Sequence, residues 1–121
     1  MSNKDRGRRF DLEERTAKFG EAIIAYARTL PCDPVTSSLI TQLARSSTSI
    51  GANYREAADS GSRTAFRYRI GICKREAREN KYWLRMIAAA VPQSKNSARL
   101  LWTEAKELHL IFAAIFLKLR E

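Results

Sequence analysis

The sequence contains few of the residues that interrupt helices, with only five glycines and three prolines among 121 residues. Long stretches have neither residue, and this favours long helices over the many short strands of a sandwich or barrel. Hydrophobic residues make up 45% of the chain, which excludes a disordered class. A chain of this length is expected to form one domain around one core.

Long apolar runs are also absent. The longest uncharged apolar run is Leu110–Leu117, far short of the ~20 residues that a membrane-spanning helix needs. Residues 1–9 are polar and basic, without the apolar segment of a secretory leader. The two cysteines, Cys32 and Cys73, are too few for the usual disulfide framework. We therefore expect a cytoplasmic protein that has no contact with a membrane.

Side chains typical of catalytic and metal sites are scarce. His109 is the sole histidine, and the cysteines lack the spacing of a zinc site. Glu76 and Glu79, at i and i+3, resemble half of a helical carboxylate site, but no Glu-x-x-His sequence accompanies them. Ion pairing with Arg75 and Lys81 explains these acids more simply. We expect no enzymatic activity, no metal and no cofactor; an enzyme using the two glutamates with a metal is the weakest alternative.

Apolar residues recur at three- and four-residue steps in four segments, which predicts four helices. Asp11 with Glu14 indicates a capping box at the start of the first helix. Asp33 is a natural N-cap for the second, with Pro34 at its first position. The predicted boundaries are about 11–30, 34–59, 63–90 and 97–120, preceded by a flexible basic tail over residues 1–10.

Two connections contain further capping residues. Ser60-Gly61-Ser62 has the composition of a turn between the second and third helices. Ser94, Asn96 or Ser97 can cap the fourth helix. Short connections between four helices indicate an all-α, antiparallel, up-down-up-down four-helix bundle over residues 11–121.

The second predicted helix is rich in small residues between Ser46 and Ala52, which allow a neighbouring helix to approach closely. This stretch lacks the glycine spacing of a phosphate-binding loop, and inside a helix its N–H groups are already used. We expect Arg45, Asn53 and Glu56 to be structural, with Asn53 and Glu56 in a buried network paired with Arg45.

The charge balance favours a polyanionic partner, because 22 basic residues face 13 acidic ones and the net charge is +9. In the third helix, six cations share a narrow arc at 100° per residue, a basic ridge rising about 33 Å. Like charges at this spacing repel by ~0.2–0.5 kcal/mol per pair, so the arrangement invites a functional explanation. The ridge consists of Arg63, Arg67, Lys74, Arg78, Lys81 and Arg85.

Two interpretations of the basic ridge remain open. It can bind RNA or DNA, and because no aromatic-rich surface accompanies it, contact with the phosphate backbone is then expected rather than base recognition. Alternatively, it is a solvated face, partly paired with acids on neighbouring helices.

The fourth predicted helix is apolar on two opposite sides. One stripe runs from Leu101 to Leu119 and fits a core, whereas Leu110, Ala114 and Leu117 lie about half a turn away. A helix that is apolar all round must be buried all round, so we expect a homo-oligomer with these three residues at the subunit interface. The alternative is an apolar patch exposed on a monomer.

Two segments in fixed order carry a family resemblance. Residues 42–57, QLARSSTSIGANYREA, and residues 62–66 followed by 70–84, IGICKREARENKYWL, resemble the 23S ribosomal RNA intervening-sequence protein family, also called the S23 or four helix bundle protein family. The resemblance covers roughly residues 16–119. One departure is Ala57-Ala58, where many members carry a glycine after the glutamate.

This resemblance implies an up-down-up-down bundle that assembles into a homo-oligomer, with a pentamer expected. Some members are encoded inside insertions of bacterial 23S ribosomal RNA genes. The family is similar to the accessory protein of diversity-generating retroelements, a basic pentamer that binds nucleic acid and a reverse transcriptase. No enzymatic activity is established for the family. An oligomeric nucleic-acid-binding module is therefore the expectation, and a protein–protein assembly or scaffold module without nucleic acid is the alternative.

Overall fold

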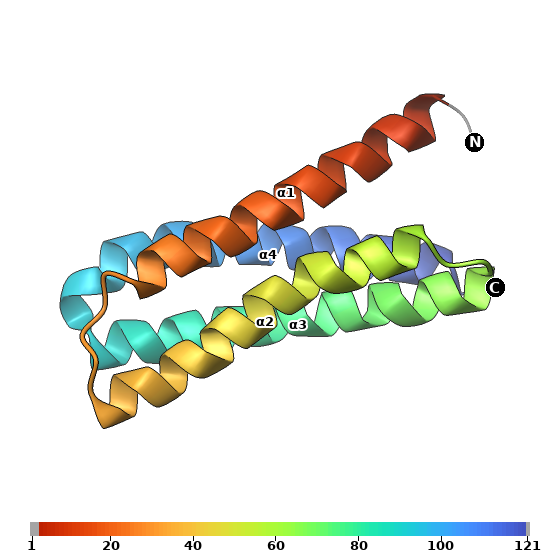
Figure 1. The fold of residues 1–121 in the computed structure, drawn as a ribbon. Coiled ribbons are helices and arrows are strands. Elements are labelled where there is room, and N and C mark those ends of the chain that lie inside the picture. The colour runs from red at the N-terminus through yellow and green to blue at the C-terminus, as the bar shows by residue number, and fades with distance from the viewer. Residues whose placement is uncertain (1–2, 121) are drawn as a thin grey trace.

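The protein folds as four long helices joined by short connections. The structure, a computed structural model, describes the backbone of residues 3–120 and the side chains of residues 11–120. Within that range it contains no strand. The helices are α1 (Asn3–Ala27), α2 (Pro34–Ala58), α3 (Arg63–Ala90) and α4 (Lys95–Lys118), with a short 3-10 turn, η1 (Pro92–Ser94), before α4. Successive helices run in opposite directions, as predicted (Figure 1).

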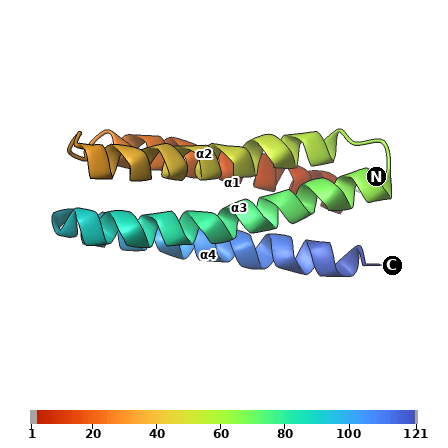
Figure 2. The ribbon, with the colours of Figure 1, turned by 90° about the horizontal axis from the view of Figure 1, so that it is seen from below.

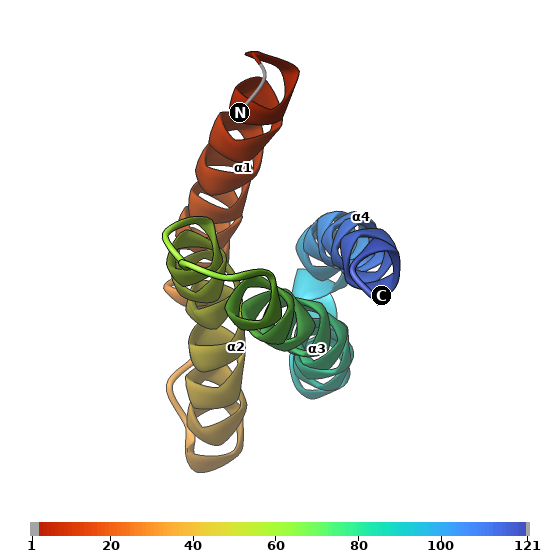
Figure 3. The ribbon, with the colours of Figure 1, turned by 90° about the vertical axis from the view of Figure 1, so that its right-hand side faces the viewer.

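The third helix lies at the centre of the packing. Its contacts with α2 and with α4 are the most extensive in the molecule, whereas α1 and α4 touch over a small area. Viewed from below, α1 and α2 form one layer and α3 and α4 the other (Figure 2). Seen from the end, the N-terminal half of α1 diverges from the other helices (Figure 3). No helix in the described range combines the length and apolar character that crossing a bilayer requires.

The start of α1 differs from the sequence prediction. Residues 1 and 2 lie outside the described residues, but from Asn3 onward the backbone of the predicted flexible tail is helical. Asp11 is therefore inside a helix, where the backbone N–H groups already have helical acceptors, and the predicted capping box with Glu14 is not formed. The helix also ends earlier than predicted, at Ala27, and Thr29 and Leu30 form turn hydrogen bonds after it.

The predicted cap of α2 is confirmed. Asp33 Oδ1 accepts a hydrogen bond from the backbone N–H of Thr36 at 2.9 Å, and Pro34 occupies the first helical position. Hydrogen bonds from Thr36 lower the pKa of Asp33, because they stabilise its ionised form. Ser62 caps α3 in the same way, accepting from the N–H of Ala65 at 3.1 Å.

The start of α4 differs from the capped starts of α2 and α3. The helix begins at Lys95, directly after η1, and no side chain caps it. The hydroxyl of Ser94 is used elsewhere, lying 2.8 Å from the Tyr26 hydroxyl of α1. Of the three predicted capping residues, Asn96 and Ser97 thus lie within the first turn and Ser94 stands before it without capping.

The core combines apolar side chains from all four helices with a small polar layer. The largest fully buried apolar side chains are Ile23, Leu43, Ile50, Ile70, Leu84, Ile87, Leu108 and Phe112. Between α2 and α3, the buried Asn80 donates from Nδ2 to Ser46 Oγ at 2.8 Å. Cys73 is also buried here, and burial raises the pKa of its thiol to about 12.

Small residues of α2 bring the helices close together, as the sequence indicates. Ser46 and Ser47 are fully buried. A Cβ atom at Gly51 would lie 3.2 Å from Thr16 Oγ1 of α1, so glycine permits this approach. Thr16 is itself buried and donates to the Leu12 carbonyl at 2.7 Å.

Candidate nucleic-acid interface

The basic ridge follows the edge of α3 that faces α4. Arg67, Lys74 and Lys81 are half-buried along the seam between the two helices, whereas Arg63, Arg78 and Arg85 are exposed. The structure therefore brings the six predicted cations together on one edge. It also shows that half of them pack against α4. Arg63 reaches the same helix, because its Nη2 donates to the Lys118 carbonyl at 3.3 Å.

Phe116 of α4 lies beneath two ridge cations. The guanidinium carbon of Arg67 lies 3.7 Å from the centre of the Phe116 ring, and Lys74 Nζ lies 5.1 Å from it. A Cβ atom at Gly71 would lie 3.1 Å from Phe116 Cε2, so the glycine makes room for the ring. These cation–π contacts hold the charged groups in place without neutralising them.

A second aromatic ring of α4 lies near the middle of the seam. Lys81 Nζ lies 5.7 Å from the Trp102 ring centre, and Lys106 Nζ lies 5.8 Å from it. Lys106 comes from α4, so it adds a cation to the ridge that the sequence pattern of α3 did not include. Beside Trp102, a hollow of about 510 Å³ is bordered by Arg85, Lys95 and Arg99.

The carboxylates of α4 form ion pairs with α1 and not with the cations of the ridge. The two acidic residues of this helix are Glu104 and Glu107. Arg15 of α1 forms a bidentate pair with Glu104, with both N···O distances 2.8 Å, and reaches Glu107 at 3.6 Å. The predicted pairing of ridge cations with acids of a neighbouring helix therefore does not occur through α4.

His109 reports the resulting positive field. Its pKa is lowered, first by burial and then by the charges of Lys81, Lys74 and Arg78. A proton on the imidazole is disfavoured first because burial removes its hydration and then because the three cations repel it. The middle of the seam is thus a place where positive charge accumulates and an anion would be favoured.

Two tyrosines stand on the outward side of α3, next to the ridge. Tyr68 and Tyr82 are 66% and 54% exposed. The expectation that no aromatic surface accompanies the ridge is therefore wrong. The signal was present in the sequence, because each tyrosine is seven residues from Arg75, which places all three on one side of the helix.

The predicted polar network has different partners. Arg45 Nη1 donates to Glu76 Oε2 of α3 at 2.8 Å, and Asn53 Oδ1 accepts from Arg69 of α3 at 2.9 Å. Glu56 is exposed instead of buried. Asn53 and Glu56 are not paired with Arg45. Arg45 and Asn53 instead bind two different residues of α3 across the α2–α3 interface.

The glutamate pair of α3 is part of that interface. Glu76 is buried and Glu79 is partly exposed, and Arg45 bridges both, with a distance of 3.6 Å to Glu79 Oε1. Arg75, the predicted partner, lies only at 3.9 Å from Glu76, and Lys81 lies at Trp102. No group of three or more possible metal-binding side chains exists among the described residues.

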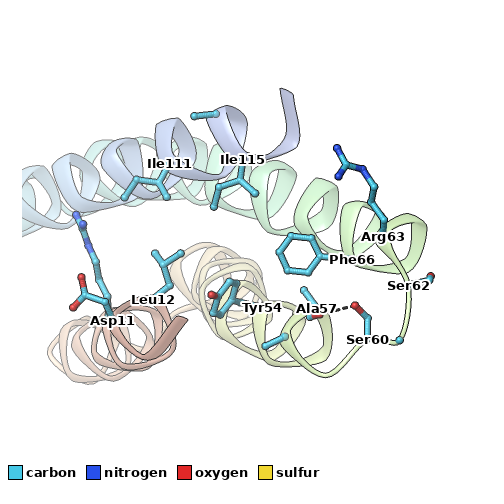
Figure 4. A pocket seen from close by; sticks show the side chains of 14 residues that line it. Asp11, Leu12, Tyr54, Ala57, Ser60, Ser62, Arg63, Phe66, Ile111 and Ile115 are labelled. Atoms are coloured by element: carbon cyan, nitrogen blue, oxygen red, sulfur yellow. Dashed lines mark hydrogen bonds between the residues drawn. The ribbon is translucent and has the colours of Figure 1, made fainter. Parts of the chain in front are cut away.

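The predicted interface stripe of α4 is exposed. Leu110 and Leu117 are 56% and 61% accessible, and Ala114 between them is also exposed. Ala114 borders a largely apolar hollow of about 780 Å³ between α1, α4 and the end of α2. Leu12 of α1 and Ile111 of α4 face each other across it (Figure 4).

Comparisons with known proteins agree with the architecture. The family model of the 23S rRNA-intervening sequence protein matches residues 8–113. No curated protein matches the sequence. The crystal structure of a protein of unknown function from the S23 ribosomal protein family of Bacteroides thetaiotaomicron is 25% identical. The match between the two structures covers 89% of this chain and 96% of the Bacteroides chain, with a TM-score of 0.77.

Proposed function

Because this chain belongs to the 23S rRNA-intervening sequence protein family, we propose that it is a non-enzymatic module that binds nucleic acid, RNA in particular, through the basic ridge of α3. The ridge consists of Arg63, Arg67, Lys74, Arg78, Lys81 and Arg85, with Lys106 of α4 beside it. Its ligand is the phosphate backbone, which every nucleic acid presents regardless of sequence.

Cations share aromatic rings along the seam between α3 and α4, and this is the observation that carries the proposal. Arg67 and Lys74 both lie on Phe116, and Lys81 and Lys106 both lie near Trp102. The lowered pKa of His109 agrees with this accumulation of positive charge. Cations that repel one another cost stability unless a counter-charge is supplied. The nearby α4 carboxylates are held by Arg15, so they do not supply it. A phosphate chain would supply it, and the counterions released from the nucleic acid would drive the association.

Fixed side chains also favour this role. Arg67 and Lys74 rest on Phe116, and Lys81 rests near Trp102. Long basic side chains lose conformational entropy when they bind, about 0.5–1.5 kcal/mol each. Half of the ridge has already been ordered by the fold, so less of this cost remains for binding.

We propose further that the protein is a homo-oligomer assembled through Leu110, Ala114 and Leu117, with five subunits as the resemblance in its sequence implies. Two leucines that are more than half exposed on one helix face are unfavourable in water. Several copies of the ridge in one particle would bind one nucleic acid multivalently, which raises the apparent affinity without new contacts.

The exposed ridge residues give the sharpest test of nucleic-acid binding. In Arg63→Glu/Arg78→Glu/Arg85→Glu, none of the altered side chains is packed in the core, and Arg63 loses its hydrogen bond to the Lys118 carbonyl. A fluorescently labelled oligouridylate and a duplex RNA are titrated with protein at several salt concentrations. The wild type should bind with a steep salt dependence, a log–log slope of about −4 if a single strand contacts all six cations. The variant should bind weakly and with a shallower slope.

A matched control separates the ridge from total charge. Lys18→Glu/Arg28→Glu/Arg55→Glu also changes three exposed cations outside α3, so both triple variants carry the same net charge. Equal loss of affinity in the two triples would show that binding follows net charge, not the ridge. Salt-independent binding, or none by the wild type, would reject the proposal.

The alternative is a protein–protein assembly module, and the apolar hollow at Leu12 and Ile111 favours it (Figure 4). A hollow of this kind is suited to an apolar side chain of a partner. If the wild type binds neither RNA, the ridge serves solubility and the hollow becomes the place where a partner is expected.

A further inference from the structure

The outward side of α3 carries two large rings that the bundle does not cover. Tyr68 and Tyr82 are 66% and 54% exposed, although tyrosine usually buries much of its ring. Neither ring contributes to the core. Their exposure needs an explanation beyond the stability of the bundle.

The two rings are arranged in line. They are fourteen residues apart, which is about 21 Å along the helix, and Arg75 lies midway between them. Seven residues turn the helix by almost two full turns, so Tyr68, Arg75 and Tyr82 point to the same side. We call these three residues the tyrosine face. Arg78 and Arg85 of the basic ridge border it and are also exposed.

Tyr82 is held by its neighbour. Its ring lies edge-on to Trp83, with ring centres 5.1 Å apart and an interplanar angle of 76°. Together with Arg75, Arg78 and Glu79, the two rings border a shallow hollow of about 500 Å³. The carboxylate of Glu79 lies 3.6 Å from Arg45, which offsets its charge. The exposed ring is thus fixed beside two guanidinium groups.

An exposed ring next to arginines is the combination that binds unpaired nucleotides. A free base stacks on the ring, and the adjoining phosphates pair with the cations. In a duplex the bases are already stacked inside the helix, and they cannot use such a ring. The 21 Å between the rings corresponds to about six nucleotides at the spacing of one stacked strand.

A second copy of the chain fits this surface less well. Two-fold pairing centred on the tyrosine face would bring Arg75 of one copy against Arg75 of the other. Such like charges repel, whereas a polyanion removes the repulsion. Charge complementarity therefore selects nucleic acid as the occupant.

We propose that the tyrosine face binds single-stranded nucleic acid, with unpaired bases stacked on Tyr68 and Tyr82 and phosphates on Arg75 and the adjoining ridge. This inference rests on the proposed function and adds a ligand class to it. Nucleic acid with loops or single-stranded segments is bound in preference to continuous duplex.

The test compares Tyr68→Ala/Tyr82→Ala with the wild type, using labelled oligoadenylate and a duplex RNA of similar length. Loss of one stacked base weakens binding by about 5- to 150-fold, so the double variant should bind the single strand at least tenfold more weakly. The salt slope should stay unchanged, because tyrosine carries no charge. Duplex binding should also stay unchanged. Tyr68→Phe/Tyr82→Phe should retain wild-type affinity.

Val35→Ala is the matched control, because Val35 is a large exposed side chain on α2, away from the ridge. Equal weakening of single-strand and duplex binding, or no weakening, would overturn the inference. A smaller particle mass of the double alanine variant in light scattering would also overturn it, because the face would then join subunits. Failure of the proposed function differs from these outcomes, since the wild type itself would then show no salt-dependent binding.

Discussion

Arg45 of α2 and Glu76 of α3 form an ion pair in which the arginine is exposed and the glutamate is buried. Nη1 of Arg45 donates to Oε2 of Glu76 at 2.8 Å, and 49% of the arginine side chain but only 5% of the glutamate side chain is exposed. The pKa of Glu76 is raised mainly by burial, an effect that Arg45 opposes and that a hydrogen bond with Glu79 reinforces. The cation at the surface thus makes a charge tolerable inside the α2–α3 interface.

We predict that Arg45→Ala destabilises the protein in a pH-dependent way. The variant leaves a buried carboxylate without its main partner, which costs about 1–3 kcal/mol near pH 7. A raised pKa in the folded state means that stability is fully present below the ordinary value of 4.5 and falls as pH rises through the folded pKa. Without Arg45 that pKa rises further, so urea denaturation should show a larger loss at pH 7 than at pH 4.5.

Glu76→Gln is the control for this prediction. The amide fits the same space and can still accept from Arg45, but it does not ionise. Its stability should lie within about 1 kcal/mol of the wild type at pH 7, and the contribution of position 76 to the pH dependence should vanish. A pH-independent loss in Arg45→Ala would contradict the role assigned to the charge of Glu76.

His109 should report both the cations and a bound polyanion. As the sole histidine, it gives one set of imidazole signals in an NMR titration. Its pKa should lie below 6.5 in the free protein and rise in Lys81→Gln, since Lys81 is the foremost of the lowering charges. Addition of oligouridylate should also raise it, because phosphate opposes the field of the cations.

Lys106→Gln is the matched variant for this experiment. Lys106 approaches the same tryptophan ring as Lys81, at a nearly equal distance, but it is not among the charges that lower the pKa of His109. Its removal should leave the titration almost unchanged. An imidazole pKa that stays constant when RNA saturates the protein would place the phosphates away from the centre of the ridge.

Two glycines should respond oppositely to alanine. At Gly20 a Cβ atom would meet nothing closer than 3.9 Å, so Gly20→Ala should stabilise α1 by about 0.5–1 kcal/mol. At Gly51 the Cβ would lie 3.2 Å from the buried Thr16, and Gly51→Ala should be destabilising overall despite a similar gain in helix propensity, because overpacking costs about 1–3 kcal/mol. Thermal unfolding of the two variants measures both signs. Stabilisation by both alanines would show that α1 and α2 are less tightly packed at Gly51.

The proposed self-association has its own test. Light scattering of the wild type should give a mass several times that of the 13.8 kDa chain. Leu110→Glu/Leu117→Glu should lower the mass while leaving the helical circular dichroism intact, because both side chains are exposed in the single chain. Val35→Glu, which alters an exposed apolar residue of α2, should keep the wild-type mass. A wild type of single-chain mass would refute self-association.

Much of the fold follows from local rules. The step of three and four residues between apolar positions predicted four helices, and the Asp33-Pro34 pair predicted the start of α2 correctly. These features depend on neighbouring residues alone. The missed start of α1 shows the limit of such rules, because a good capping residue at Asp11 does not stop a helix whose preceding backbone can also be helical.

The candidate site needed information from across the bundle. Helical periodicity placed the six ridge cations together, but it could not show that Phe116 lies beneath Arg67 or that Glu104 is paired with Arg15. The spacing of seven residues placed Tyr68 and Tyr82 on one side of α3, but it could not show that no other helix covers that side. The polar network was assigned to the wrong partners for a related reason, since its hydrogen bonds join α2 to α3.

The sequence by itself determined the class of the fold, the order of its helices and the edge of α3 on which positive charge gathers, because these properties arise from residue types at helical spacing. Only the tertiary structure decided which charged side chains form ion pairs and which aromatic rings remain exposed. Those outcomes depend on which helix faces which, and residues such as Arg15 and Glu104, 89 positions apart in the chain, meet only when the helices pack.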